Sequence, residues 1–335
     1  MTAIRSVKDK MDFTRKKVLV TGGLGFIGSH LTHRLVGLGA QVTLVDSLTP
    51  ECGGNLFNVN GIEGKVKVNV SDVCDARGMQ YLIQGQEYLF NLAGQTSHMD
   101  SMEDPERDME INCRAQLSML ESCRKYNPGV KIVFASTRQI YGKPDHLPVD
   151  EKHLLRPVDV NGIHKIAGEG YHILYNNVYG IRACALRLTN TYGPRMRIKD
   201  ARQTFLGLWI KKILEGKSFE VWGGEQRRDF TYVDDAVDAF LLAAASEESN
   251  GKVFNLGGRE VINLRDLAHL LVATHGGGTF ETRGFPDDRK RIDIGDYYAD
   301  DQYIHAALGW EPKISLREGL GRTLAFFREH EGHYR

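Results

Sequence analysis

The sequence contains little cysteine, and no two cysteines stand at the spacing of a metal or redox motif. Its 335 residues include five cysteines, at positions 52, 74, 113, 123 and 184. An odd, scattered set argues against a disulfide framework and is typical of reduced thiols. We therefore expect a cytoplasmic protein that holds no metal.

The chain also lacks an excess of charge of either sign and a long apolar run. Lysine plus arginine and aspartate plus glutamate each number 43, which leaves a formal net charge of zero. We therefore expect no nucleic acid and no membrane surface among its partners, and no apolar run reaches the length of a membrane span. Residues 1–16 are polar and charged, without the apolar core of a signal peptide, so we expect them to form a loose N-terminal extension.

A glycine-rich turn between two strand-like runs is the most informative feature that the sequence does contain. The apolar run 18–20 breaks into glycines at positions 22, 23, 25 and 28, and a helical pattern and a second run, 41–45, follow. This order is typical of a βαβ unit that binds a dinucleotide, because glycines let the backbone approach a pyrophosphate at a helix N-terminus. Asp46 ends the second run, where an acid bonds the adenosine ribose. Its charge repels a 2′-phosphate and no arginine directly follows it, so the sequence favours NAD over NADP.

Strand-like runs alternate with helical patterns along most of the chain, which predicts a doubly wound parallel sheet of the Rossmann type. After residue 192 the pattern becomes less regular, which indicates a smaller, interleaved C-terminal lobe. We expect the NAD-binding domain over 17–190, with segment 236–258 returning to it, and a substrate lobe mainly over 191–335. The seven runs lie at 18–20, 41–45, 64–70, 88–92, 130–134, 183–188 and 253–256.

Two long helical segments, at about 104–126 and 160–179, are apolar on more than one stripe. Each of them therefore buries two faces. Either both faces pack inside one chain, or the two helices form a four-helix contact between the subunits of a homodimer.

Further motifs follow the fifth strand in a fixed order. They lie at 134–142 (FASTRQIYG), 161–169 (NGIHKIAGE), 187–195 (RLTNTYGPR), 228–235 (RDFTYVDD) and 307–313 (ALGWEPK). With the glycine-rich turn, these motifs resemble the extended short-chain dehydrogenase/reductase family, in its nucleotide-sugar epimerase, dehydratase and decarboxylase branch. The resemblance covers about residues 17–330.

The resemblance implies two catalytic positions and a set of NAD contacts. Thr137 places its hydroxyl beside the sugar O4, although a threonine at a strand end also bonds its own backbone. Lys165 matches the lysine of a Tyr-x-x-x-Lys motif, which binds the nicotinamide ribose and lowers the pKa of the tyrosine. The implied cofactor contacts are Gly22, Gly25, Phe26, Ile27, Gly28, Asp46, Asp72, Val73, Ala93, Gly94, Gln95 and Lys165.

Position 161 departs from the family, because it holds asparagine where the motif has tyrosine. Asparagine does not titrate, so it cannot take the proton that leaves the sugar hydroxyl. Three interpretations stay open: another base such as His98 or His164 acts, Thr137 and Lys165 run a slow reaction alone, or the protein binds NAD and a nucleotide sugar without turnover.

The two residues after Thr137 help to distinguish epimerisation from dehydration and decarboxylation. Arg138 and Gln139 stand where the sugar 4,6-dehydratases of the family have an Asp-Glu pair, and the decarboxylases have a glutamate in place of Gln139. Epimerisation at C4 of a UDP-hexose or UDP-uronic acid is then the simplest chemistry, with decarboxylation or another reaction of the branch as the alternative. Arg138 pairs either with a substrate carboxylate or with a surface acid. The implied substrate contacts are Thr137, Arg138, Asn190, Thr204, Val221, Trp222, Arg228 and one of Arg289 or Arg291.

Overall fold

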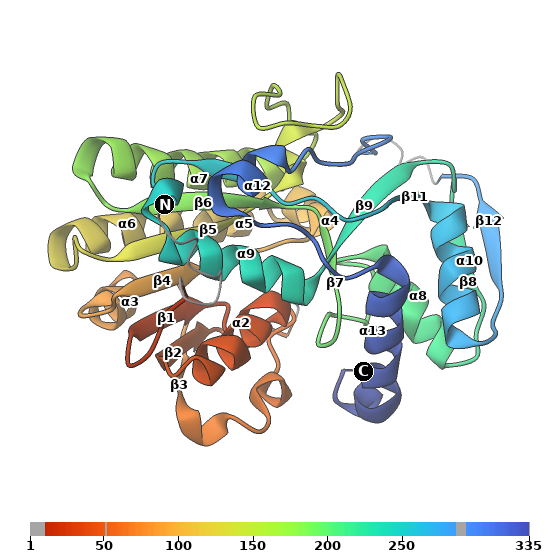
Figure 1. Cartoon of the computed structure of the whole chain (residues 1–335), viewed down its shortest axis with the longest axis horizontal. Helices are drawn as coiled ribbons and strands as arrows, with labels where there is room; N and C mark the ends of the chain where they lie inside the picture. The colour runs from red at the N-terminus through yellow and green to blue at the C-terminus, as the bar shows by residue number, and fades with distance from the viewer. Residues whose placement is uncertain (1–10, 51, 286–292, 335) are drawn as a thin grey trace, which may run out of the picture.

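The computed structural model describes residues 11–50, 52–285 and 293–334. Its central feature is a seven-stranded sheet in the order β10-β6-β5-β4-β1-β2-β3, and every pair of neighbouring strands is parallel (Figure 1). The predicted doubly wound fold is therefore confirmed, and each strand of this sheet falls on a predicted run. The strands are β1 (Lys17–Thr21), β2 (Gln41–Asp46), β3 (Val66–Val70), β4 (Tyr88–Asn91), β5 (Lys131–Thr137), β6 (Ala183–Leu188) and β10 (Val253–Asn255).

Helices cover both faces of the sheet because its strands are apolar on both sides. In β1, Val18 and Val20 pack in a cluster with α2 (Phe26–Gly37) and α9 (Val233–Ala245). Leu19 points the other way, into a cluster beneath α3 (Ala76–Ile83), α6 (Ala115–Tyr126) and α7 (Val160–Tyr179). Such burial on both faces is the pattern expected of a parallel sheet.

A second lobe has its own core and lies beside the sheet at the right of Figure 1. It contains a three-stranded sheet, β11-β9-β7, and a two-stranded sheet, β12-β8. Most of these strands are only three or four residues long, so their alternation gives little sequence signal. The elements are β7 (Asn190–Tyr192), β8 (Phe219–Trp222), β9 (Arg227–Tyr232), β11 (Val261–Asn263), β12 (Phe280–Arg283), α8 (Phe205–Leu214), α10 (Leu264–His275) and α13 (Leu316–His330).

The chain passes between the two lobes more than once. β10 pairs with β6 and α9 packs on β5, so segment 236–258 lies with the large sheet. α12 (Gln302–Leu308) also packs beside β10, within the segment expected to form mainly the smaller lobe. The reason is apolar burial, because Ile304 and Leu308 belong to the same core as β10.

The predicted helix over 104–126 is interrupted. It consists of α5 (Pro105–Met109), a π-helical turn (Glu110–Arg114) and α6, and α4 (His98–Glu103) precedes it. A π-helical turn is often found near a functional site. Here it carries Asn112, whose buried amide reaches the loop after β4.

The expectation of a loose extension is wrong for residues 11–16, while residues 1–10 lie outside the described part of the chain. Phe13 is buried, and its ring lies 5.0 Å from that of Tyr88. Burial of an aromatic side chain fixes this segment against the core. Among the described residues, none of the helices has both the length and the apolar character that crossing a membrane requires.

Candidate active site

A large cavity of about 1050 Å³ runs along the carboxyl ends of the sheet strands and reaches into the second lobe. Its walls include the glycine-rich turn after β1, Asp46 at the end of β2, Ala93 after β4 and Thr137 at the end of β5. Thr204 and Trp222 contribute from the second lobe. The carboxyl edge of such a sheet is where ligands bind in this type of fold.

The glycine-rich turn is too tightly folded for side chains. A Cβ atom on Gly28 would lie 2.1 Å from the carbonyl oxygen of Gly22, and Gly22 itself has a φ of +67°. The turn therefore presents the first backbone N–H groups of α2 to the cavity, an arrangement that favours an anionic group. The predicted contacts Gly22, Gly25, Phe26, Ile27 and Gly28 all line the cavity.

Asp46 ties this turn to the end of β2. Its carboxylate accepts hydrogen bonds from the backbone N–H groups of Leu24 (3.1 Å) and Leu48 (3.0 Å), and burial raises its pKa. Carboxylate oxygens can accept further hydrogen bonds, so Asp46 is also placed to bind ribose hydroxyls. The N-terminus of α2 and Asp46 thus fit the pyrophosphate and adenosine ribose of NAD.

The other predicted cofactor contacts divide into two groups. Asp72, Val73, Ala93 and Gly94 line the cavity. Gln95 does not line it: its backbone carbonyl accepts the side-chain amides of Asn112 and Asn161, and its own amide donates to the Ser97 carbonyl. Gln95 therefore holds the loop after β4 in place.

Thr137 and Lys165 approach the same part of the cavity from β5 and α7. The Thr137 hydroxyl accepts the backbone N–H of Gln139 (3.3 Å) at the start of a short helical turn, η4 (Arg138–Tyr141), and its side chain also faces the cavity. The Lys165 ammonium donates to the Ala135 carbonyl (3.1 Å) and lies 4.9 Å from the centre of the Phe134 ring. Burial lowers the pKa of Lys165 to about 8.

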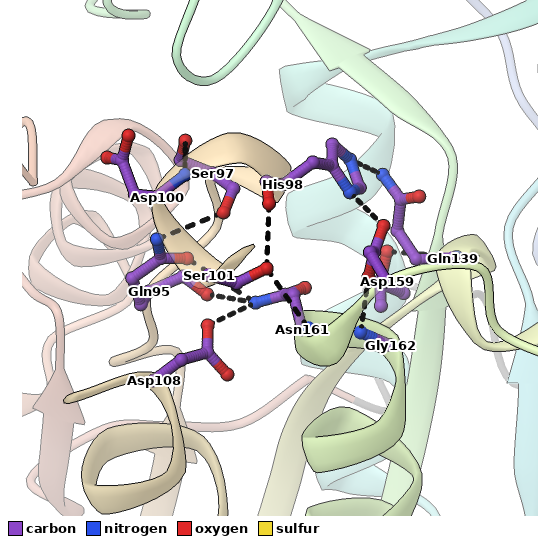
Figure 2. Close-up of polar contacts among 11 residues, drawn as sticks. Gln95, Ser97, His98, Asp100, Ser101, Asp108, Gln139, Asp159, Asn161 and Gly162 are labelled. Atoms are coloured by element: carbon purple, nitrogen blue, oxygen red, sulfur yellow. Dashed lines mark hydrogen bonds and ion pairs between the residues drawn. The ribbon is translucent and has the colours of Figure 1, made fainter. Parts of the chain in front are cut away.

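Asn161 is buried at the N-terminal end of α7, and its side-chain amide nitrogen is engaged with the protein (Figure 2). Its amide nitrogen donates to the Gln95 carbonyl (2.8 Å) and to the carboxylate of Asp108 (3.0 Å). Asn161 also lines the cavity, but this hydrogen bonding gives it a structural task.

Of the two histidines that the sequence analysis named as bases, His98 lines the cavity and His164 does not. The Nδ1 atom of His98 lies 2.5 Å from the Asp159 carboxylate, and its Nε2 atom contacts the side-chain amide of Gln139 (Figure 2). His164 is bonded to Asp108 (2.7 Å).

Several predicted substrate contacts line the second-lobe end of the cavity. They are Asn190, Thr204, Trp222 and Arg228, and burial lowers the pKa of Arg228 to about 10. Val221 does not line the cavity, since its side chain alternates into the core of the lobe. Arg289 and Arg291 lie outside the described residues.

Arg138 lines the cavity beside Thr137 and is only partly paired. Its Nη2 donates to the Asn190 side chain (3.3 Å), and the guanidinium lies 5.1 Å from the centre of the Tyr297 ring. Its Nη1 is buried and has no hydrogen-bond partner within the described part of the chain. An unpaired buried donor costs free energy unless a ligand satisfies it.

Sequence reasoning missed two aspartates that organise this site. Asp159 stands directly before the predicted helix 160–179 and is its N-cap, accepting the Gly162 N–H at 2.7 Å. An aspartate at that position is a recognisable helix start. Asp108 had no such signal, because its partners Asn161 and His164 lie more than 50 residues away.

Comparison with known proteins agrees with this geometry. The profile of the NAD dependent epimerase/dehydratase family matches residues 18–257. The chain belongs to this family. Members of the family use NAD, and the cavity described above has the features that this cofactor requires.

Individual relatives extend the likeness over most of the chain. A putative UDP-glucose 4-epimerase of Methanocaldococcus jannaschii is 33% identical, over 93% of this chain and 99% of that protein. UDP-glucuronic acid decarboxylase 1 of Xenopus tropicalis is 30% identical, over 98% of this chain and 76% of that protein. The crystal structure of UDP-glucose 4-epimerase from Thermotoga maritima with UDP-glucose has a TM-score of 0.85 and 32% identity, over 94% of this chain and 99% of that one.

The position of Asp46 predicts a strong preference for NAD over NADP. A carboxylate beside a 2′-phosphate costs a few kcal/mol at the effective dielectric of a protein surface, so we expect NAD to bind at least about thirty-fold more tightly. Titration calorimetry with both cofactors measures this ratio. Asp46→Asn should reduce the ratio, whereas Asp145→Asn, an exposed aspartate that does not line the cavity, is the control and should leave it unchanged. Equal affinity of the wild type for NAD and NADP would contradict the role given to Asp46.

The lowered pKa of Lys165 predicts a pH-dependent stability in the cofactor-free protein. The unfolded chain binds this proton up to about pH 10.4, and the folded protein loses it near pH 8. Between these values the unfolded state holds more protons, so this group makes stability rise with pH there, whereas below about pH 8 its buried charge costs a constant amount. Lys165→Met should therefore stabilise the protein at neutral pH, and the gain should shrink as the pH rises towards about 10.

Chemical denaturation at several pH values measures this difference, with the exposed Lys217→Met as control. A stability gain for Lys165→Met that does not change with pH would be inconsistent with the burial of a charged Lys165.

Proposed function

We propose that this chain is an NAD-dependent nucleotide-sugar epimerase that inverts C4 of a UDP-hexose or UDP-uronic acid through a transient keto sugar. The observation that carries the proposal is that Thr137 and Lys165 line the same cavity as the glycine-rich turn and Arg228. A sugar diphosphate reaching from Arg228 to Thr137 would bring its O4 close to the nicotinamide end of the cofactor. The relatives named as UDP-glucose 4-epimerases support this assignment.

Each residue then has a distinct task. Bound NAD supplies the chemistry of accepting a hydride from the sugar carbon and giving it back. The Thr137 hydroxyl orients O4, and Lys165 would hold the nicotinamide ribose with its ammonium. Arg228, with its fork of donors, would neutralise the diphosphate. Inversion results when the keto sugar turns over in the cavity before the carbon is reduced.

Position 161 is the point where we infer that this chain differs from its family. Asn161 stands in the place of the tyrosine of the Tyr-x-x-x-Lys motif and cannot exchange a proton. An active enzyme must therefore take its base from another residue.

Arg138 favours a uronic acid over a neutral hexose. Arg138 lines the cavity together with Thr137, and a sugar carboxylate would form a charge-assisted pair with its guanidinium, whose Nη1 has no acceptor among the described residues. A 4-keto uronic acid is a β-keto acid and can lose carbon dioxide, so decarboxylation is the second candidate reaction. A decarboxylase among the relatives supports that candidate, and Gln139 in place of a glutamate argues against it.

Conversion of UDP-glucose, UDP-glucuronic acid and their 4-epimers by the NAD-loaded protein tests the proposal. Proton NMR should show interconversion of the two uronic acids with C6 retained, and Thr137→Ala should slow it by about 10²-fold. Arg138→Gln should raise KM for the uronic acids about ten-fold or more and leave the neutral sugars nearly unchanged. Arg227→Gln, an exposed arginine that does not line the cavity, is the matched control.

Other results of this experiment would indicate a function different from C4 epimerisation. Loss of C6 would indicate a decarboxylase, and conversion of the neutral sugars alone would contradict the role of Arg138. Tight binding of a UDP-sugar with no conversion of any sugar would indicate a binding protein and contradict the proposed activity.

We also propose that the protein is a homodimer that pairs α7 and the neighbouring helices of two subunits. Ile163, Leu174 and Val178 form a stripe on α7 and are 55%, 49% and 61% exposed, and Met109 of α5 is 43% exposed. Exposed apolar side chains in a row are typical of a contact surface.

Light scattering should therefore give twice the chain mass for the wild type and a monomer for Leu174→Asp. Leu56→Asp, an equally exposed apolar site on another element, should stay dimeric. A monomeric wild type would contradict the dimer.

A further inference from the structure

We propose that His98, oriented by Asp159, is the catalytic residue that accepts and returns the proton of the sugar hydroxyl. This inference rests on the proposed function. It identifies the residue that acts as the base, a role that Asn161 cannot fill because asparagine does not titrate.

The pair has the geometry of an oriented base. The Asp159 side chain is only 2% exposed, and one of its oxygens accepts the Gly162 N–H while the other faces His98 Nδ1 at 2.5 Å. An N-cap carboxylate fixed by a helix cannot turn away from its second partner. In the neutral ring the proton therefore sits on Nδ1, and the Nε2 lone pair points away from Asp159.

The Nε2 atom faces the wall of the cavity that carries Thr137. It contacts the side-chain amide of Gln139 (Figure 2). The backbone N–H of Gln139 in turn donates to the Thr137 hydroxyl. The amide is a donor, so it occupies the lone pair as a hydroxyl would. A sugar hydroxyl held by Thr137 replaces the Gln139 amide at Nε2 when substrate binds.

The tyrosine, histidine and α7 side chains that could compete with His98 are engaged or absent from the described cavity wall. No tyrosine is found among the described residues that line the cavity, and His98 is the single histidine in that set. The Asn161 amide is held by Gln95 and Asp108, and the Lys165 ammonium by Ala135. His164 is turned to Asp108, away from the cavity.

Oxidation of C4 couples the transfer of a proton to the transfer of a hydride. The O4–H bond breaks and its proton moves to His98 Nε2, while the C4–H hydrogen leaves with its electron pair to bound NAD, so the carbon becomes a ketone. In the reverse step the hydride returns to the opposite face of C4, and Nε2–H protonates O4. Asp159 keeps its negative charge throughout and stabilises the imidazolium, so it is a positioning residue.

Asp159 at the start of α7 is the carboxylate bonded to His98. Asp100 and Glu103 on α4, Arg138 on η4 and Lys165 on α7 also line this cavity.

The pH dependence of kcat/KM for epimerisation by the NAD-loaded wild type tests the proposal without any variant. The base must be neutral to act, so kcat/KM should fall towards acidic pH. His98→Gln should lower kcat by about 10²–10⁴-fold with little change in KM and should remove the acidic fall. Added imidazole should restore activity to His98→Ala, which a purely structural role would not allow.

Two further variants test the roles of Asp159 and His164 separately. Asp159→Asn keeps the helix cap but cannot accept from Nδ1, and it should lower kcat by at least about ten-fold. His164→Gln, a histidine with an aspartate partner outside the cavity, should retain wild-type kinetics. An active wild type with no fall in kcat/KM at acidic pH, or a His98→Gln variant with normal kcat, would overturn the base while leaving the epimerase assignment intact. A wild type that converts no sugar would overturn both.

Discussion

The Asp159 carboxylate joins the two chain segments on which the site depends. One oxygen begins α7 by accepting the Gly162 N–H, and the other holds His98 at the start of α4. Because α7 also carries Lys165 and Asn161, this single side chain sets the positions of the groups around the sugar end of the cavity relative to the loop after β4. A buried carboxylate with two such partners is costly to disturb, since each unpaired buried donor costs about 1–3 kcal/mol.

A second set of buried hydrogen bonds supports the first. The Gln95 carbonyl accepts hydrogen bonds from the amides of Asn112 and Asn161, and the Asp108 carboxylate accepts one from Asn161. These bonds join the loop after β4, the π-helical turn and α7. Asparagine at position 161 therefore has a clear structural task in this chain. Its bond to the Gln95 carbonyl ties down the loop that leads to His98.

Features that depend on residues close together in the sequence were predictable, whereas features that depend on distant residues were not. The glycine-rich turn and Asp46 depend on neighbours within about 25 residues, and they are readable as a local pattern. The seven strands of the large sheet were also predictable, because each is an apolar run between helical segments. The short strands of the second lobe gave little signal, and Val221 was assigned to the ligand although it belongs to the core of that lobe. The choice between His98 and His164 depends on Asp159 and Asp108, partners 61 and 56 residues away, and only packing in three dimensions decides it.

The central claim is that a hydride leaves C4 of the sugar and returns to the same carbon of the same molecule. A UDP-uronic acid labelled with deuterium at C4, incubated with the NAD-loaded protein in ordinary water, tests this directly. The account predicts that the 4-epimer forms with its deuterium retained at C4, as read by mass spectrometry and NMR. An epimer that has exchanged its C4 deuterium for solvent hydrogen would contradict it.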